Sequence, residues 1–244
     1  MKRFKLNIRL KHTITLGLPL LCLTICYCAP NSSSKKVPPF KNSTPPQFSN
    51  LPISNNPVYA KADLILISEV DPTIVIDLQY TRPSSITKYP LYPKSFPALC
   101  RPETALRLKY ANSIVKEFGY KLKVWDAYRP PSAQWKLYEA SGRNDTFVAN
   151  PGNAPSQHSC GTAVDITLVS LSGKEILMPT GFDSFTPQAS SRYNHSNPDV
   201  ARNLKILQYA MYKAGFHPLF TEWWHYIDIN YKKYPNTIPL SKIQ

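Results

Sequence analysis

The clearest alternation of apolar and polar residues runs over 163–168, with the period of two that is expected of a β-strand. Val164, Ile166 and Leu168 share one face of this strand, which we expect to pack on the core. The opposite face carries Asp165, which the strand would direct towards an open space. The pattern therefore predicts a half-buried strand that presents one chemically active residue.

Three other stretches have the spacing of helices, with apolar residues recurring every three or four positions. They cover 102–118, 131–140 and 198–214. A proline begins each stretch, as is typical of a first helical turn, and Gly119 and Gly215 end the first and the last. The sequence therefore predicts three helices with defined ends.

Short runs of β-branched and other apolar residues predict further strands. These runs lie at 62–70, 73–80, 121–130 and 221–229, and Arg129-Pro130 fixes the end of the third. A turn at Ser172-Gly173 predicts a hairpin partner over 175–179. The proline-rich stretch 81–100 predicts an ordered loop that could form one wall of a cleft. Together these elements indicate an α+β domain with a central, mainly antiparallel sheet flanked by helices.

The net charge of +14 is unevenly distributed along the 244 residues. Residues 1–61 hold nine Lys or Arg and no acidic residue, whereas residues 62–244 hold 20 basic and 15 acidic residues. The body is thus mildly basic and has no dense basic stripe, which argues against nucleic acid as a partner. The sequence leaves the oligomeric state open.

The first 61 residues predict two segments outside the folded domain. Over 1–29, a basic stretch precedes an apolar one, as in an export signal, and the run ending at Cys26 loosely resembles a lipoprotein box. We therefore expect a periplasmic or cell-envelope protein, with cleavage, lipid attachment and a retained membrane tether all open. Over 30–61, proline, serine and asparagine dominate, which predicts a disordered linker. The folded domain would then cover 62–244.

Candidate metal ligands flank the central strand. His158 and Asp165 are separated by Gly161, which lets the chain bend back so that both side chains reach one point. An imidazole and a carboxylate are two of the three protein ligands of a catalytic zinc site. His225, in the run TEWWHYIDI, is the candidate for the third ligand.

The same run supplies Glu222 as a candidate general base, and Arg129 is a candidate fixed cation for a developing oxyanion. On a regular strand, residues three apart face opposite sides. A bulge, or a loop that carries Glu222, is therefore needed for Glu222 and His225 to reach one metal ion.

Four motifs, in this order, carry a resemblance to a known family: DAYRP (126–130), SQHSCGTAVDITL (156–168), GFD (181–183) and EWWHY (222–226). The combination strongly resembles the D-alanyl-D-alanine dipeptidases of the vancomycin-resistance type, which are zinc peptidases acting on peptidoglycan peptides. It covers the chain from about Asp63 to the C-terminus. Cys160 and the segment after Phe185 depart from the family's pattern, so the choice of substrate is less fixed than the metal site.

The resemblance implies one zinc ion per chain, a general base at Glu222 and transition-state stabilisation by Arg129. It implies that the zinc ligands are His158, Asp165 and His225. It also implies that Asp183 and Ser156 bind the free amino end of a small D,D-dipeptide.

Other interpretations stay open at this level. The chain could be a zinc D,D-carboxypeptidase acting on longer stem peptides, or a non-catalytic peptidoglycan-binding module. A pocket closed around both ends of a dipeptide would favour the dipeptidase, and a channel open on the amino side the carboxypeptidase. Arg129 could be a surface ion-pair residue, Asp183 a turn former and Ser156 a plain loop hydroxyl. A disulfide between Cys100 and Cys160 is also possible.

Overall fold

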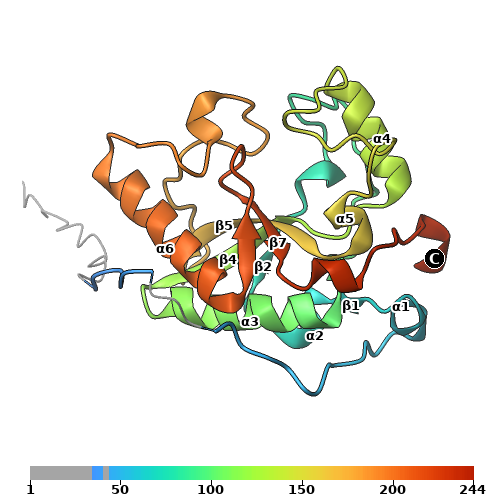
Figure 1. Ribbon diagram of the computed structural model, residues 1–244, viewed down its shortest axis with the longest axis horizontal. Coiled ribbons are helices and arrows are strands. Elements are labelled where there is room, and N and C mark those ends of the chain that lie inside the picture. The colour runs from blue at the N-terminus through green and yellow to red at the C-terminus, as the bar shows by residue number, and fades with distance from the viewer. Residues whose placement is uncertain (1–34, 41–43) are drawn as a thin grey trace, which may run out of the picture. The chain divides into compact units, whose positions relative to one another are not determined.

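A five-stranded sheet forms the centre of the computed structural model, which describes residues 35–40 and 44–244 (Figure 1). The strand order is β2-β4-β5-β7-β6, with β2 parallel to β4 and the other neighbouring pairs antiparallel. The strand bounds are Val75–Ile76 (β2), Tyr120–Asp126 (β4), Ala163–Ser170 (β5), Phe216–Pro218 (β6) and His225–Asp228 (β7). A two-stranded sheet pairs β1 (Ile65–Leu66) with β3 (Leu99–Cys100). The predicted α+β class is confirmed.

Two long helices, α3 (Pro102–Lys116) and α6 (Pro198–Ala214), pack on each other and on the sheet (Figure 1). Val164, Ile166 and Leu168 of β5 lie in the hydrophobic core that these helices enclose, as predicted. Gly215 ends α6 with a φ of 88°, and a Cβ there would collide with the buried Arg107 guanidinium. This position therefore requires glycine for both its conformation and its space.

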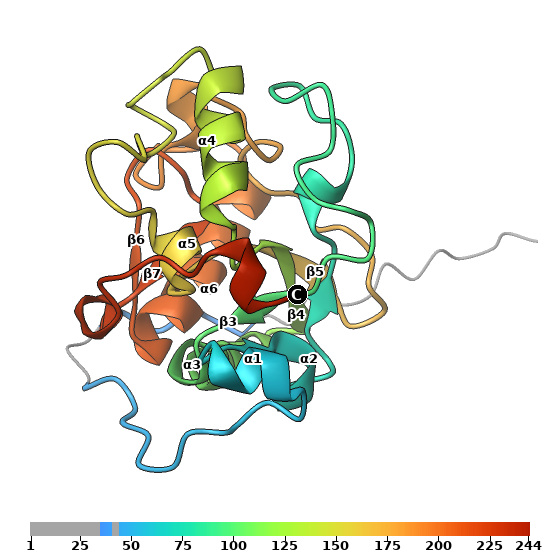
Figure 2. The ribbon, with the colours of Figure 1, turned by 90° about the vertical axis from the view of Figure 1, so that its right-hand side faces the viewer.

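The remaining helices are shorter. α4 (Pro131–Ala140) lies on the opposite side of the sheet from α3 (Figures 1 and 2). The other short helices are α1 (Pro57–Lys61), α2 (Ile67–Val70), α5 (Gln157–Cys160) and the 3-10 turns Gln79–Thr81, Pro187–Ala189, Tyr231–Lys233 and Leu240–Lys242. In the described residues, no helix is long and apolar enough to cross a membrane.

Several predicted strands are shorter than expected. The run 62–70 forms only β1 before the chain turns into α2, and the run 73–80 forms only β2. The third predicted strand ends at Asp126, four residues before Pro130, and the last covers only 225–228 of the predicted 221–229. The segment 175–179 forms a single bridge, between Glu175 and Val169. Short apolar runs do not distinguish a strand from a buried helical turn, because both are covered on all sides. Cys100 and Cys160 are both buried and free.

The disordered linker predicted over 30–61 is wrong for its C-terminal part. Pro57–Lys61 forms α1, which Asn56 caps by accepting a hydrogen bond of 2.9 Å from the Val58 amide. Further upstream, the Pro46 carbonyl accepts a hydrogen bond from Arg107, and the Phe48 ring lies against the same guanidinium. This segment therefore belongs to the folded body. The export signal predicted over 1–29 lies outside the described residues.

Candidate metal and active site

Two neighbouring strands and one short helix bring the three candidate ligands together. Asp165 on β5 and His225 on β7 are register partners, so their side chains leave the sheet side by side. His158 lies on α5, which ends at Gly161 with a φ of 77° before the chain enters β5. A Cβ on Gly161 would lie 2.8 Å from Leu64, so the return that aligns His158 with Asp165 depends on glycine.

The ligand atoms have the spacing of a tetrahedral metal site. His158 Nε2 lies 3.2 Å from His225 Nδ1, and these two nitrogens lie 3.4 and 3.0 Å from oxygens of Asp165. Donors about 2.0–2.1 Å from zinc at tetrahedral angles are separated by about 3.3–3.4 Å. The three side chains are the His/Cys/Asp/Glu group in the described residues whose ligand atoms could hold one metal ion.

The protonation of the ligands also suits a cation. His158 Nδ1 lies 2.7 Å from the Ala127 carbonyl oxygen, to which it donates, and this leaves Nε2 as the lone-pair nitrogen. Burial lowers the pKa of His225, which favours the neutral imidazole. Although burial favours the neutral form of Asp165, the two neighbouring imidazoles hold the pKa of this carboxyl well below its usual range.

Glu222 lies in the turn between β6 and β7, so it is carried by a loop, as its spacing from His225 requires. Its Oε2 lies 3.9 Å from His225 Nδ1, and the residue is 7% exposed. Burial and the charges of Asp165 and Asp183 raise the pKa of Glu222 well above its usual value. The side chain therefore lies beside the ligand cluster in an environment that favours a bound proton.

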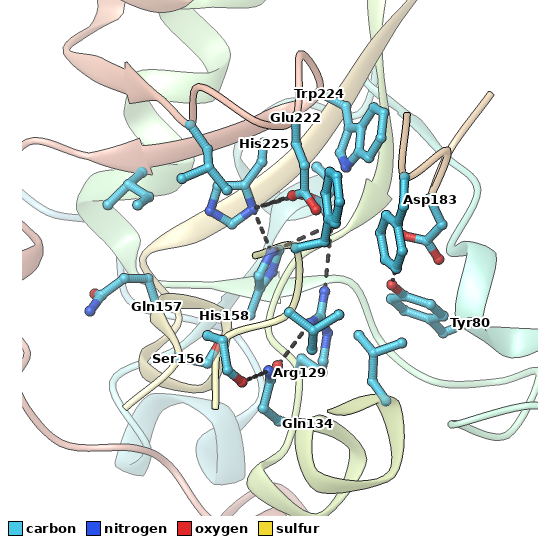
Figure 3. Close-up of a pocket in the computed structure, with 18 of the residues that line it drawn as sticks. Tyr80, Arg129, Gln134, Ser156, Gln157, His158, Asp183, Glu222, Trp224 and His225 are labelled. Carbon is cyan, nitrogen blue, oxygen red and sulfur yellow. Dashed lines mark hydrogen bonds and ion pairs between the residues drawn. The ribbon is translucent and has the colours of Figure 1, made fainter. Parts of the chain in front are cut away.

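Arg129 follows β4 and points its guanidinium at the ligands (Figure 3). Its Nε and Nη2 both lie 2.8 Å from Oδ2 of Asp126, and Nη1 donates to Oε1 of Gln134 at 2.8 Å. Nη2 also lies 3.5 Å from Asp165 Oδ2. At 5% exposure, Arg129 is not a surface ion-pair residue.

Asp183 lies on the other side of the cluster, next to Tyr80 (Figure 3). Its Oδ1 accepts a hydrogen bond of 3.1 Å from the Tyr80 hydroxyl, whereas Oδ2 is buried without a partner. Burial and the charge of Asp165 raise the pKa of Asp183 to about 7. Its φ of 57° shows that Asp183 also forms a turn, so the two interpretations of this residue are compatible.

Ser156 precedes α5 at the N-cap position but makes no capping hydrogen bond with its side chain, which leaves the hydroxyl available. Ser156 lines a cavity of about 180 Å³. The same cavity is lined by the three candidate ligands and by Glu222, Arg129 and Asp183. All seven residues that the sequence singled out are therefore brought together in one cavity.

The sequence missed the residues that support this constellation. Asp126 lies in the DAYRP motif but had no assigned role, although it binds Arg129 and accepts a hydrogen bond of 2.8 Å from the Tyr92 hydroxyl. Gln134 and Tyr80 line the cavity from segments predicted only as a helix and a strand. The available signal in the sequence was the carboxylate Asp126, three residues before the candidate cation Arg129.

A family model described as D-ala-D-ala dipeptidase matches residues 60–242. The chain belongs to this peptidase family. It is 30% identical over 164 residues to a D-alanyl-D-alanine dipeptidase of Escherichia coli, covering 67% of the chain and 83% of that protein. It is also 30% identical over 152 residues to a D-alanyl-D-alanine dipeptidase of Enterococcus faecium, covering 55% of the chain and 75% of that protein.

Among solved structures, the LD-carboxypeptidase LdcB is similar at 22% identity and a TM-score of 0.38, covering 72% of this chain and 79% of that one. This likeness is too distant to assign any residue. The family and the His-Asp-His cluster together make the chain a metallopeptidase with zinc as its cofactor.

Proposed function

We propose that this protein hydrolyses the dipeptide D-Ala-D-Ala. The observation that carries the proposal is the single cavity that holds the ligand cluster, Glu222, Arg129 and Asp183. Its volume of about 180 Å³ is below the roughly 300–1,000 Å³ of sites for drug-sized ligands, which favours a substrate as small as a dipeptide. The named activity of the two relatives points to the same substrate.

His158, Asp165 and His225 would hold the zinc ion, through two imidazole nitrogens and one carboxylate. Zinc bound by three protein ligands lowers the pKa of water to about 7 and polarises a carbonyl group. The Ala127 carbonyl keeps the His158 ring in the required tautomer. This hydrogen bond fixes the His158 ring independently of any metal.

Glu222 would move the proton of the reaction. Its carboxylate would accept a proton from the attacking water and then donate it to the amine that leaves when the peptide bond breaks. The raised pKa makes Glu222 a stronger base than an ordinary carboxylate. A cation on the adjacent ligands would favour the ionised form that this role requires.

Arg129 and Asp183 would act on opposite charges of the substrate. The guanidinium of Arg129, fixed by Asp126 and Gln134, would stabilise the oxygen that becomes negative during attack. The unpaired Oδ2 of Asp183 would accept a hydrogen bond from the free ammonium group. Ser156, on the wall of the same cavity, would supply a further hydrogen bond to the bound dipeptide.

The assay that tests the proposal compares D-Ala-D-Ala with a pentapeptide that ends in D-Ala-D-Ala, with and without a chelator. We expect hydrolysis of the dipeptide, its loss with the chelator and its recovery with zinc. Cleavage of the pentapeptide alone would instead support the carboxypeptidase. The positions of Glu222 and Arg129 beside the ligands argue against a non-catalytic peptidoglycan-binding module.

We also propose that the reaction takes place outside the cytoplasm, in the periplasm or cell envelope. The support is the basic-then-apolar pattern over 1–29, which is typical of export signals. Fractionation of cells that produce the full chain tests this, and recovery only with cytoplasmic markers would overturn it.

A further inference from the structure

A second cavity, of about 420 Å³, lies beside the active-site cavity. The two share Gln134, Pro155 and Ser156 as a common wall. Gln134 is fixed in this wall, because it accepts from Arg129 and donates to the Ala149 carbonyl, each at 2.8 Å. The second cavity therefore adjoins the active-site cavity at a side chain held by two hydrogen bonds.

The lining of this second cavity is polar but uncharged. Within the part of the chain that the structure describes, no acidic or basic side chain lines it. Its polar groups include the hydroxyls of Ser159 and Thr237 and the amide of Asn153. Ser159 is 1% exposed, and its hydroxyl has no hydrogen-bond partner. A neutral ligand rich in hydrogen-bonding groups suits such a lining, whereas an ion would find no counter-charge.

Trp135 gives the cavity an exposed aromatic surface. Its side chain is 45% exposed, whereas Trp125, Trp223 and Trp224 are at most 9% exposed. An indole ring left partly in water offers a broad apolar face on which a flat ligand can stack. Of the two cavities, Trp135 lines only the second, so lining the active-site cavity does not account for its exposure.

We propose that this cavity binds a neutral sugar ring that bears hydroxyl and acetamido groups. The apolar face of such a ring would stack on Trp135, its hydroxyls would pair with those of Ser159 and Thr237, and its acetamido group would pair with Asn153. The inference goes beyond the proposed function and does not depend on it. The enzyme would bind a chain of N-acetylated amino sugars while its separate active site accepts the dipeptide.

The test titrates the full chain with chitotriose, a neutral trimer of N-acetylglucosamine. Because Trp135 is the exposed tryptophan, we expect a saturable change in tryptophan fluorescence, with the affinity measured by calorimetry. Trp135→Ala should weaken binding at least tenfold, and Asn153→Ala should weaken it several-fold. Tyr89→Ala, which removes a 47% exposed ring outside both cavities, is the matched control and should bind as the unaltered protein does.

Two results would overturn the sugar site: no heat or fluorescence change at millimolar chitotriose, or binding that Trp135→Ala leaves unchanged. Equal affinity for the cationic trimer of glucosamine would also overturn it, because the uncharged lining offers no counter-charge to the ammonium groups of that ligand. Hydrolysis of D-Ala-D-Ala is measured on the same variants and should be unchanged. A failure of the sugar site is thereby distinguished from a failure of the proposed enzyme activity.

Discussion

One short segment, 126–129, orients two functional groups from different elements. The Ala127 carbonyl fixes the ring of His158, and Asp126 fixes the guanidinium of Arg129. Oδ2 of Asp126 also lies 3.7 Å from His158 Nδ1. The fully buried Asp126 thus positions both the candidate metal ligand His158 and Arg129, the cation proposed to stabilise the oxyanion.

Asp126→Asn should lower kcat by about 10- to 100-fold, the usual cost of losing an outer partner of a metal site. The amide cannot supply the charged oxygen to which Nε and Nη2 of Arg129 both bind. The measurement is steady-state kinetics on D-Ala-D-Ala, with circular dichroism to verify folding. A purely structural role would lower the amount of folded enzyme and leave kcat per active site unchanged.

Glu222→Gln should retain zinc and lose activity by about 10²–10⁴-fold, the contribution typical of a general base. The amide is almost isosteric but accepts no proton at neutral pH. Zinc content by atomic absorption and kcat on the same sample check both parts. His225→Ala is the comparison variant and should lose the metal as well as the activity. Full activity of Glu222→Gln would remove this residue from the mechanism.

At the scale of elements, local chemistry predicts much of this fold. The starts of α3, α4 and α6 could be predicted because proline begins each helix, and Gly215 marks the end of α6. α3 ends at Lys116, two residues before the predicted end at Phe118. The core face of β5 was equally readable, since Asp165 alternates with core residues. The prediction of a half-buried strand was wrong, because the face that carries Asp165 is buried as well. The ligand set could also be predicted, but the motifs rather than spacing carried that inference, because β7 joins β5 through pairing that no local pattern records.

The elements that could not be predicted depend on distant contacts. β6 has only three residues, and its pairing partner is β7. β1 stays short because it pairs with β3 over two residues only. The segment upstream of residue 62 has a composition typical of linkers, yet it folds because the body supplies partners such as Arg107. The composition of a segment indicates how much apolar surface the segment can bury by itself, but it does not include contacts with distant parts of the chain.

Removing residues 1–61 should therefore destabilise the domain compared with a chain that begins at Thr44. The deletion takes away the Pro46 carbonyl and the Phe48 ring, so Nη1 of the fully buried Arg107 keeps only the Ala214 carbonyl as its acceptor. A loss of about 2 kcal/mol is expected from one hydrogen bond to a charged group and one cation–π contact. This would lower Tm by about 4–8 °C in calorimetry. Equal Tm values for the two chains would mean that residues 44–61 act as a linker and do not stabilise the domain.

At the scale of the whole molecule, the cavity concentrates negative charge that a cation must balance. Asp126, Asp165, Asp183 and Glu222 are each less than 10% exposed, and Arg129 is their buried basic neighbour. Burial of this many carboxyl groups is costly without a further positive charge. The buried carboxyl groups therefore favour a divalent cation at the His158, Asp165 and His225 cluster.

Zinc removal should lower stability as well as activity. A ligand that binds only the folded state stabilises it by about 2.7 kcal/mol at a concentration 100 times Kd. We therefore expect a lower Tm after chelation, restored by added zinc, and a smaller effect in Asp165→Asn. Differential scanning calorimetry with matched chelator and zinc samples checks this. A Tm that ignores both additions would contradict a metal at this site.

Asp183 should make the stability of the metal-free protein depend on pH. Its pKa is about 7 in the folded chain against 3.8 as the ordinary value, so between these values the folded state binds more protons than the unfolded state. Stability must therefore fall as pH rises through this window and level off above about 7. The amide of Asp183→Asn does not titrate, so this variant should escape that part of the loss.

The free energy of unfolding of Asp183→Asn, relative to that of the unaltered protein, should consequently increase between about pH 4 and pH 7 by on the order of a few kcal/mol. The Tm of the variant should rise relative to that of the unaltered protein over the same range. Calorimetry in chelator at several pH values measures this difference. Ser156→Ala, a non-titrating change in the same cavity, should show a constant offset. A constant offset for Asp183→Asn as well would mean that Asp183 ionises normally in the folded chain, contrary to the raised pKa.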